Sequence, residues 1–229
     1  VNDGTALGTT SLQWSDLHLA SGGVINFNSD VTMTHSSNVL TITGGTTALD
    51  AGSTIGGNTV RTAGKESIWI PAMAMFPVAN TQVQQITEGT ATTQVIPCDP
   101  GGPEYCRFGV AMPKSWNEGT LTFRAFWSHP ATATNFGVVW VIECAAFSND
   151  DALNNTFGSA TVTDTGGTTA DLYISDESSA ITPGNTAAEG DLLKFTFFRD
   201  ASNGSDTLAV DAYVHGIMLY YTTNAANDA

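Results

Sequence analysis

The chain has 229 residues and a formal net charge of −15, and 41% of its residues are hydrophobic. That hydrophobic content supports a folded core and excludes a fully disordered chain, while the negative charge disfavours binding to nucleic acid and to anionic membrane surfaces. No apolar run approaches the roughly 20 residues of a membrane span, and no signal peptide opens the sequence.

The first part of the chain, residues 1–64, has short apolar bursts between glycine-rich turns and almost no aromatic residues. Thr, Ser, Asn and Gly dominate its polar positions, which favours strands and turns over helices. We interpret this part as a β-rich stem or docking arm. Because the sequence begins with Val rather than Met, we expect a processed product or a part of a longer chain.

The stretch DVTMTHSSNVLTITGG, residues 30–45, predicts a β-hairpin with two different faces. Val31 and Met33 alternate with threonines before the turn, and Leu40 and Ile42 do so after it. An isolated hairpin is marginal in water, and the residues around this one are mostly small and polar. We therefore expect copies of the chain to cover the apolar face, which makes these four residues candidate interface residues.

From Lys65 onward the strand-like runs are longer and carry aromatic residues. In TLTFRAFW, residues 120–127, apolar and polar side chains alternate with the period of a strand that has one buried face. The run VVWVI, residues 138–142, is apolar on both faces and suits a central strand. We therefore predict an all-β protein in which residues 65–229 form a jelly-roll-like antiparallel β-sandwich.

Two cysteines, Cys98 and Cys106, flank the loop DPGGPEY. A disulfide between them would pin this loop, but spacing alone leaves open whether they bond or remain free thiols. Cys144 lies in an apolar run and suits the role of a small buried side chain.

Loops at one end of a sandwich are the natural contact surface, because they place variable side chains on a rigid scaffold. Tyr105, Asn203 and Asp206 are the candidate loop contacts. Asp200, Asn203 and Asp206 also offer oxygen ligands for Ca²⁺, but they lack the spacing and the bidentate Glu of an EF-hand. For Trp116, in the turn PKSWNEGT, the sequence leaves two main roles open, a subunit interface and the edge of the core.

The sequence gives no sign of catalysis. Its four histidines lie in no nucleophile elbow and in no H-E-x-x-H helix. Its neighbouring acid pairs all fall in predicted loops, whereas a glycosidase holds two carboxyl groups roughly 5–9 Å apart across a cleft. There is no Cys/His set for zinc. We expect a protein without enzymatic activity, with no catalytic or metal-ligating residues.

Two groups of segments resemble structural proteins of tailed bacteriophages, particularly those of marine phages. The first group is LGTTSLQWSDLHLASGGVINF followed by VTMTHSSNVLTI, and the second includes SIWIPAMAM, MPKSWNEGTLTFRAFWSH, DLYISDESSAIT and YYTTNAANDA. The resemblance implies a virion appendage, a tail fibre or a head fibre. It also implies a homotrimer that binds other virion proteins and contacts the host surface, including surface glycan, through its distal sandwich.

Two other functions remain as alternatives. One is a capsid decoration protein, in which the first part would lie as an arm across the shell. It would occur in far more copies per particle than a fibre. The less favoured alternative is a glycan depolymerase, which requires a cleft with an acid pair.

Overall fold

The computed structural model describes most of the second part of the chain and short stretches of the first. The chain divides into two units, Val1–Val60 and Arg61–Ala229. Within the described residues, no helix is long and apolar enough to cross a membrane. The described residues are 11, 18–20, 23–27, 31–36, 39–44, 54–55, 58–59, 64–78, 82–88, 90–130, 135–167, 171–225 and 228.

The first unit contains a three-stranded antiparallel sheet and a short strand pair. β1 (Val24–Phe27), β2 (Val31–Ser36) and β3 (Val39–Thr43) follow one another in the sheet. The pairing of β2 with β3 confirms the predicted hairpin, and β1 adds a strand that was not predicted from the sequence. β4 (Thr54–Ile55) pairs with β5 (Asn58–Thr59).

The register of this sheet gathers apolar residues on one face. Ile25, Met33 and Ile42 lie opposite one another across the three strands, and Leu40 lies two residues from Ile42 on the same face of β3. Leu40 is 60% exposed and Ile42 is 39% exposed, so the described part of the first unit does not cover these two side chains.

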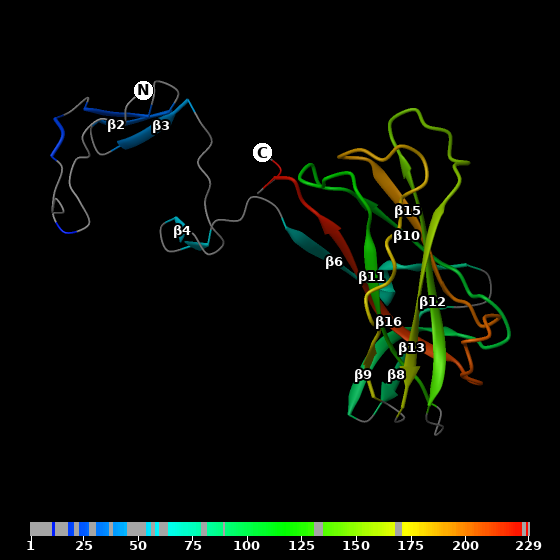
Figure 1. Ribbon diagram of the computed structural model, residues 1–229. Helices are drawn as coiled ribbons and strands as arrows, with labels where there is room; N and C mark the ends of the chain where they lie inside the picture. Colours follow the sequence, from blue (N-terminus) through cyan, green and yellow to red (C-terminus); the bar gives the residue numbers. More distant parts are fainter. Residues whose placement is uncertain are drawn as a thin grey trace. The chain divides into compact units, whose positions relative to one another are not determined.

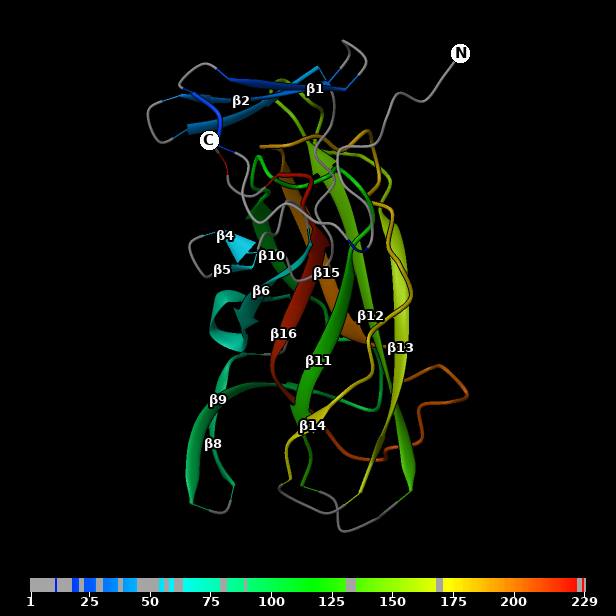
Figure 2. The ribbon, with the colours of Figure 1, turned by 60° about the vertical axis from the view of Figure 1, so that its left-hand side comes forward.

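The second unit is an antiparallel β-sandwich, as predicted (Figure 1). Figure 2 shows the same two sheets from another side, with β11 and β16 in one layer and β12 and β13 in the other. A 3-10 turn, η1 (Ala72–Ala74), follows β6 (Lys65–Pro71), the first strand of this unit. The five-stranded sheet contains, in spatial order, β13 (Gly158–Gly166), β12 (Phe136–Phe147), β15 (Leu192–Arg199), β10 (Cys106–Ala111) and β7 (Phe76–Pro77). The six-stranded sheet contains β14 (Tyr173–Ile174), β11 (Thr122–Ser128), β16 (Ala212–Thr222), β9 (Ala91–Cys98) and β8 (Gln84–Glu88), with β6 (Lys65–Pro71) also paired to β16.

Aromatic side chains from both sheets fill the core. Trp140 of β12 stacks on Phe197 of β15 with ring centroids 5.4 Å apart, and Phe123 and Trp127 of β11 pack edge-on against these two rings. Along β15 every second residue is buried, while the outward residues Lys194, Thr196 and Phe198 are half-buried and Leu192 is exposed. This period-two burial is the one that the sequence predicted, and it gives the five-stranded sheet a buried inner face and a partly exposed outer face.

Trp116 belongs to this core, so the interface alternative for it is wrong. Its side chain is fully buried. The backbone N–H of Trp116 donates to the carbonyl of Pro113 at 3.0 Å, which closes the turn, and Trp116 forms a bridge with Thr223 just after β16. The turn therefore folds the indole inward, a result of tertiary pairing that the local sequence does not reveal.

A buried ion pair ties the loop after β15 to the sandwich. The Arg199 side chain is completely buried, and its Nε and Nη2 donate to the Asp206 carboxylate at 2.9 and 2.6 Å. Arg199 also donates to the carbonyls of Cys98 and Val210, and the backbone N–H of Val139 donates to Asp206 at 3.0 Å. The pair thus joins β15, β9 and β12 to one loop, and its hydrogen bonds compensate for the burial of two charges.

This ion pair corrects two predictions for the same loop. The side chain of Asp206 is only 2% exposed and fully engaged, so it is available neither as a surface contact nor as a Ca²⁺ ligand. Asp200 instead accepts a hydrogen bond from Ser202 at 2.6 Å. Asn203 is exposed, and its side-chain oxygen accepts from the N–H of Ser205. In the described part of the chain no cluster of three metal-ligating side chains occurs.

Candidate functional site

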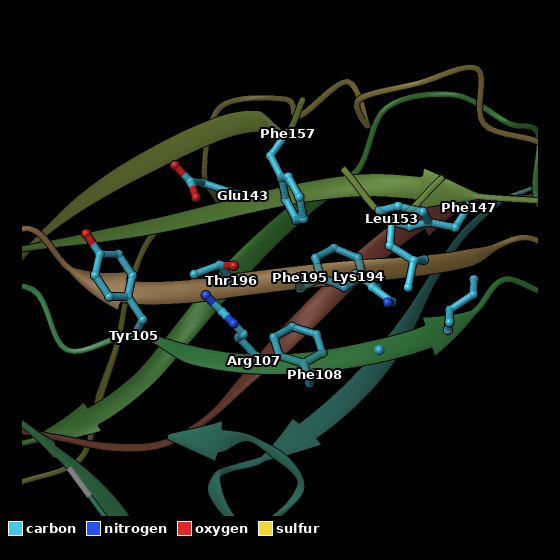
Figure 3. Close-up of a pocket in the computed structure, with 12 residues that line it drawn as sticks. Tyr105, Arg107, Phe108, Glu143, Phe147, Leu153, Phe157, Lys194, Phe195 and Thr196 are labelled. Atoms are coloured by element: carbon cyan, nitrogen blue, oxygen red, sulfur yellow. The ribbon is translucent and has the colours of Figure 1, made fainter. Parts of the chain in front are cut away.

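The outer face of the five-stranded sheet carries a cleft of about 650 Å³. Strands β10, β15 and β12 form its floor, and the loop between β12 and β13 forms one wall. Figure 3 shows Tyr105 at one end, Phe147 and Leu153 at the other, and Arg107 and Thr196 between them. The lining residues are Tyr105, Arg107, Phe108, Gly109, Glu143, Phe147, Leu153, Phe157, Leu192, Lys194, Phe195 and Thr196.

Strand register places the polar side chains in a row across the cleft. Arg107 of β10 pairs with Thr196 of β15, and Thr196 pairs with Glu143 of β12. Neighbouring strands lie about 4.8 Å apart, so this row spans roughly 10 Å from Arg107 to Glu143. Lys194 lies two residues from Thr196 on the same face.

The two ends of the cleft are apolar. Tyr105 is 38% exposed, and its ring packs on that of Phe198 with centroids 4.9 Å apart. At the other end Leu153 is 72% exposed, and the Lys194 ammonium lies 5.1 Å from the centroid of the Phe147 ring. The cleft therefore offers ring surfaces at its ends and hydrogen-bonding groups in its centre.

The central polar groups are free to bind a ligand. Among the residues that the structure describes, the side chains of Arg107, Thr196 and Glu143 have no ion-pair or hydrogen-bond partner. A guanidinium donates, a carboxylate accepts and a hydroxyl does both, so the row can recognise a ligand that carries several hydroxyl groups.

The loop that positions Tyr105 runs between the two cysteines. The N–H of Asp99 donates to the Glu104 carboxylate at 2.8 Å, and the N–H of Val78 donates to the Tyr105 carbonyl at 2.7 Å. Of the two alternatives that the sequence left open, the structure has the free thiols, with both Cys98 and Cys106 buried.

We expect all three thiols to be inert in the folded protein. Burial raises the pKa of Cys106 and of Cys144 to about 12, and burial, with Cys106 and Glu104 nearby, raises the pKa of Cys98 well above its usual value. The thiolate is the reactive form, so a water-soluble disulfide reagent at about pH 8 should titrate no thiol before unfolding and three after it. Rapid reaction in the native state, or only one reactive thiol after unfolding, would contradict this expectation.

A second polar cluster lies on the six-stranded sheet. Ser128 Oγ donates to Glu88 at 2.6 Å and lies 2.9 Å from Nε2 of His215. Burial lowers the pKa of His215, and Glu88 partly opposes this effect. In a catalytic triad the carboxylate orients the histidine through Nδ1, whereas here Glu88 lies 3.9 Å from Nε2, the nitrogen that faces the serine. This geometry does not activate Ser128 as a nucleophile.

One residue of the cleft, Tyr105, was predicted from the sequence as a contact residue. The outward positions of Lys194 and Thr196 follow from the alternation in LLKFTFFRD. That β10, β15 and β12 lie side by side could not be predicted from the alternation, because these strands are far apart in the sequence. The sequence did contain one signal for the cleft. Arg107 and Glu143 are charged residues within strand-like runs of a chain that has few charges, and such residues are candidates for a binding site.

Comparisons with known proteins give no family. No protein-family model matches the chain, and no curated protein matches it. Among solved structures, it is similar to a family 35 carbohydrate-binding module from Clostridium thermocellum, with 10% identity and a TM-score of 0.37 over 67% of this chain and 97% of that chain. It is also similar to the mannan-recognising carbohydrate-binding module TmCBM27, with 9% identity and a TM-score of 0.36 over 70% of this chain and 99% of that chain. A third similar structure is a protein of unknown function from Shewanella oneidensis MR-1, with 13% identity and a TM-score of 0.32 over 74% of this chain and 91% of that chain. At these TM-scores the similarities bear on neither ligand nor activity.

Proposed function

We propose that the chain is a non-enzymatic, homotrimeric structural protein of a phage virion appendage, and that its β-sandwich binds a saccharide of the host surface. The observation that carries the binding function is the cleft on the five-stranded sheet. The virion role is supported by the resemblance of the quoted segments to phage appendage proteins.

The cleft has the properties that saccharide binding requires. Its volume of about 650 Å³ lies within the range of about 300–1,000 Å³ found for small-molecule sites. A sugar ring has apolar faces that pack on aromatic side chains such as Tyr105, and hydroxyl groups that pair with donors and acceptors such as Arg107 and Glu143. The β-strands beneath these side chains hold them in fixed positions.

The charges of the cleft support binding over hydrolysis. Glycoside hydrolysis uses two carboxyl groups on either side of the scissile bond. Glu143 is the one carboxylate among the lining residues. None of the loop acid pairs that the sequence offered is among the lining residues, and Asp206 is held by Arg199.

The virion role predicts that the protein is a component of purified particles. Quantitative mass spectrometry of particles is expected to detect the chain at the low copy number of a fibre. A high copy number would favour the decoration role, and absence from particles would exclude both.

Replacing Tyr105 with Ala is expected to weaken saccharide binding about tenfold, because a stacked ring contributes about 1.4 kcal/mol at an exposed site. The measurement is binding of the full chain to an array of microbial surface glycans, followed by calorimetry with the best ligand. Trp69→Ala is the matched control, since Trp69 is an exposed aromatic residue of β6 on the other sheet, 43% exposed. Equal loss in both variants, or no glycan bound by the unaltered chain, would contradict the proposed site.

A further inference from the structure

We infer that the ligand of the cleft is an acidic saccharide, built from hexuronate units, whose carboxylate groups bind to Arg107 and Lys194. This inference rests on the proposed function and specifies the ligand class of the same site.

The distribution of charge is the first argument. The chain has only seven Lys and Arg residues against 22 Asp and Glu residues. Two of the seven, Arg107 and Lys194, line the cleft, together with a single carboxylate, Glu143. The cleft is thus locally cationic on a strongly anionic protein, and such a site attracts an anion that the rest of the surface repels.

The geometry of the two cations is the second argument. Arg107 pairs with Thr196, and Lys194 pairs with Gly109, so Arg107 and Lys194 are diagonal neighbours on adjacent strands. Diagonal residues in an antiparallel sheet lie about 7–8 Å apart, so both side chains rise from one stretch of the cleft floor, and the Lys194 ammonium reaches toward the Phe147 ring. Glycine at position 109 has no side chain of its own beside Lys194, and the Leu192 side chain lies against this position, with Cδ1 3.3 Å from where a Cβ would be.

The chemistry of the two side chains is the third argument. A guanidinium presents a planar fork that binds a carboxylate through two parallel hydrogen bonds, and an ammonium adds a compact charge. In the described part of the chain neither Arg107 nor Lys194 has a carboxylate partner, and the Lys194 ammonium lies over the ring of Phe147. Carboxylates supplied by the ligand satisfy these two groups.

Glu143 sets the orientation of the ligand. It lies across Thr196 from Arg107, at the opposite end of the polar row. There it can accept hydrogen bonds from sugar hydroxyls, but it repels a carboxylate. The acidic group of the sugar must therefore point toward β10, and its hydroxyl edge toward β12.

The test compares acidic saccharides with their own neutral derivatives. Oligomers of galacturonic acid and of mannuronic acid are titrated into the full chain by calorimetry, beside the same oligomers after chemical reduction of the carboxyl groups to alcohols. The acidic form is expected to bind at least about tenfold more tightly, because charge-assisted hydrogen bonds contribute more than neutral ones. Its advantage is expected to shrink as salt is added.

Variants separate the roles of the side chains. Arg107→Gln and Lys194→Gln are each expected to weaken binding of the acidic form about tenfold and to leave the reduced form unchanged. Glu143→Gln is expected to tighten binding of the acidic form severalfold, because it removes a repulsive charge. Lys114→Gln is the matched control, with the same loss of charge on an exposed residue outside the cleft. Thermal melting of each variant verifies that it is folded.

The outcomes distinguish the inference from the function on which it rests. If the reduced oligomers bind as tightly as the acidic ones, or if Glu143→Gln weakens binding of the acidic form, the inference is overturned and the saccharide-binding function stands. If no acidic or neutral saccharide binds the full chain, both are overturned.

Discussion

Replacing Arg199 with Met is expected to lower the free energy of unfolding by about 3–5 kcal/mol, because it leaves the buried carboxylate of Asp206 without its countercharge. Both side chains lie almost entirely out of water, at 0% and 2% exposed. The same change removes donors from the carbonyls of Cys98 and Val210, which then remain buried without these hydrogen bonds. Urea unfolding followed by tryptophan fluorescence measures the loss.

The double variant Arg199→Met/Asp206→Leu provides the sharper test. Removing both charges together avoids an isolated buried charge, so the double variant is expected to be more stable than Arg199→Met alone. If the single and double variants unfold at the same urea concentration, the ion pair is not the source of the effect. A loss below about 1 kcal/mol for the single variant would place the pair among ordinary surface salt bridges.

Much of the sandwich follows from alternation in the sequence. The runs that became β11 and β15 have a clear period of two, and the apolar run VVWVI lies in β12, which pairs with a strand on each side. Such patterns depend on burial of one or both faces of a strand, so they are readable without knowing the partner strand. They predict the fold class but not the order of the strands.

The predictions that failed concern loops. Trp116 and Asp206 both follow glycine, proline or asparagine turns, where polar exposure is the ordinary expectation. In the structure one is drawn into the core and the other is held by Arg199, a residue on a strand. The cleft was missed for the related reason that β10, β15 and β12 come together only through the sheet order.

The full chain is expected to form a trimer in solution, and Leu40→Glu/Ile42→Glu is expected to convert it to a monomer. These two side chains lie on the apolar face of the β1–β3 sheet, and the described part of the first unit leaves them 60% and 39% exposed. Covering a Leu or Ile side chain contributes about 1.5–3 kcal/mol, and a trimer repeats this contribution in every copy. A carboxylate buried in such an interface without a partner destabilises the trimer instead, because burying an unpaired charge costs free energy. Light scattering at several protein concentrations gives the mass.

The neighbouring residue Thr41 supplies the control, because it points to the opposite face of the same strand, across from Thr34. Thr41→Glu adds the same kind of charge to the polar face, so it should leave the trimer intact. A trimer that survives Leu40→Glu/Ile42→Glu would place the subunit interface on the sandwich, and the first unit would then be free to act as an arm on another virion protein. If the unaltered chain is a monomer, the stem interpretation is wrong, because that interpretation requires copies of the chain to cover the apolar face. The hairpin thus decides between a fibre and a decoration protein: only in a fibre does its apolar face require copies of the same chain.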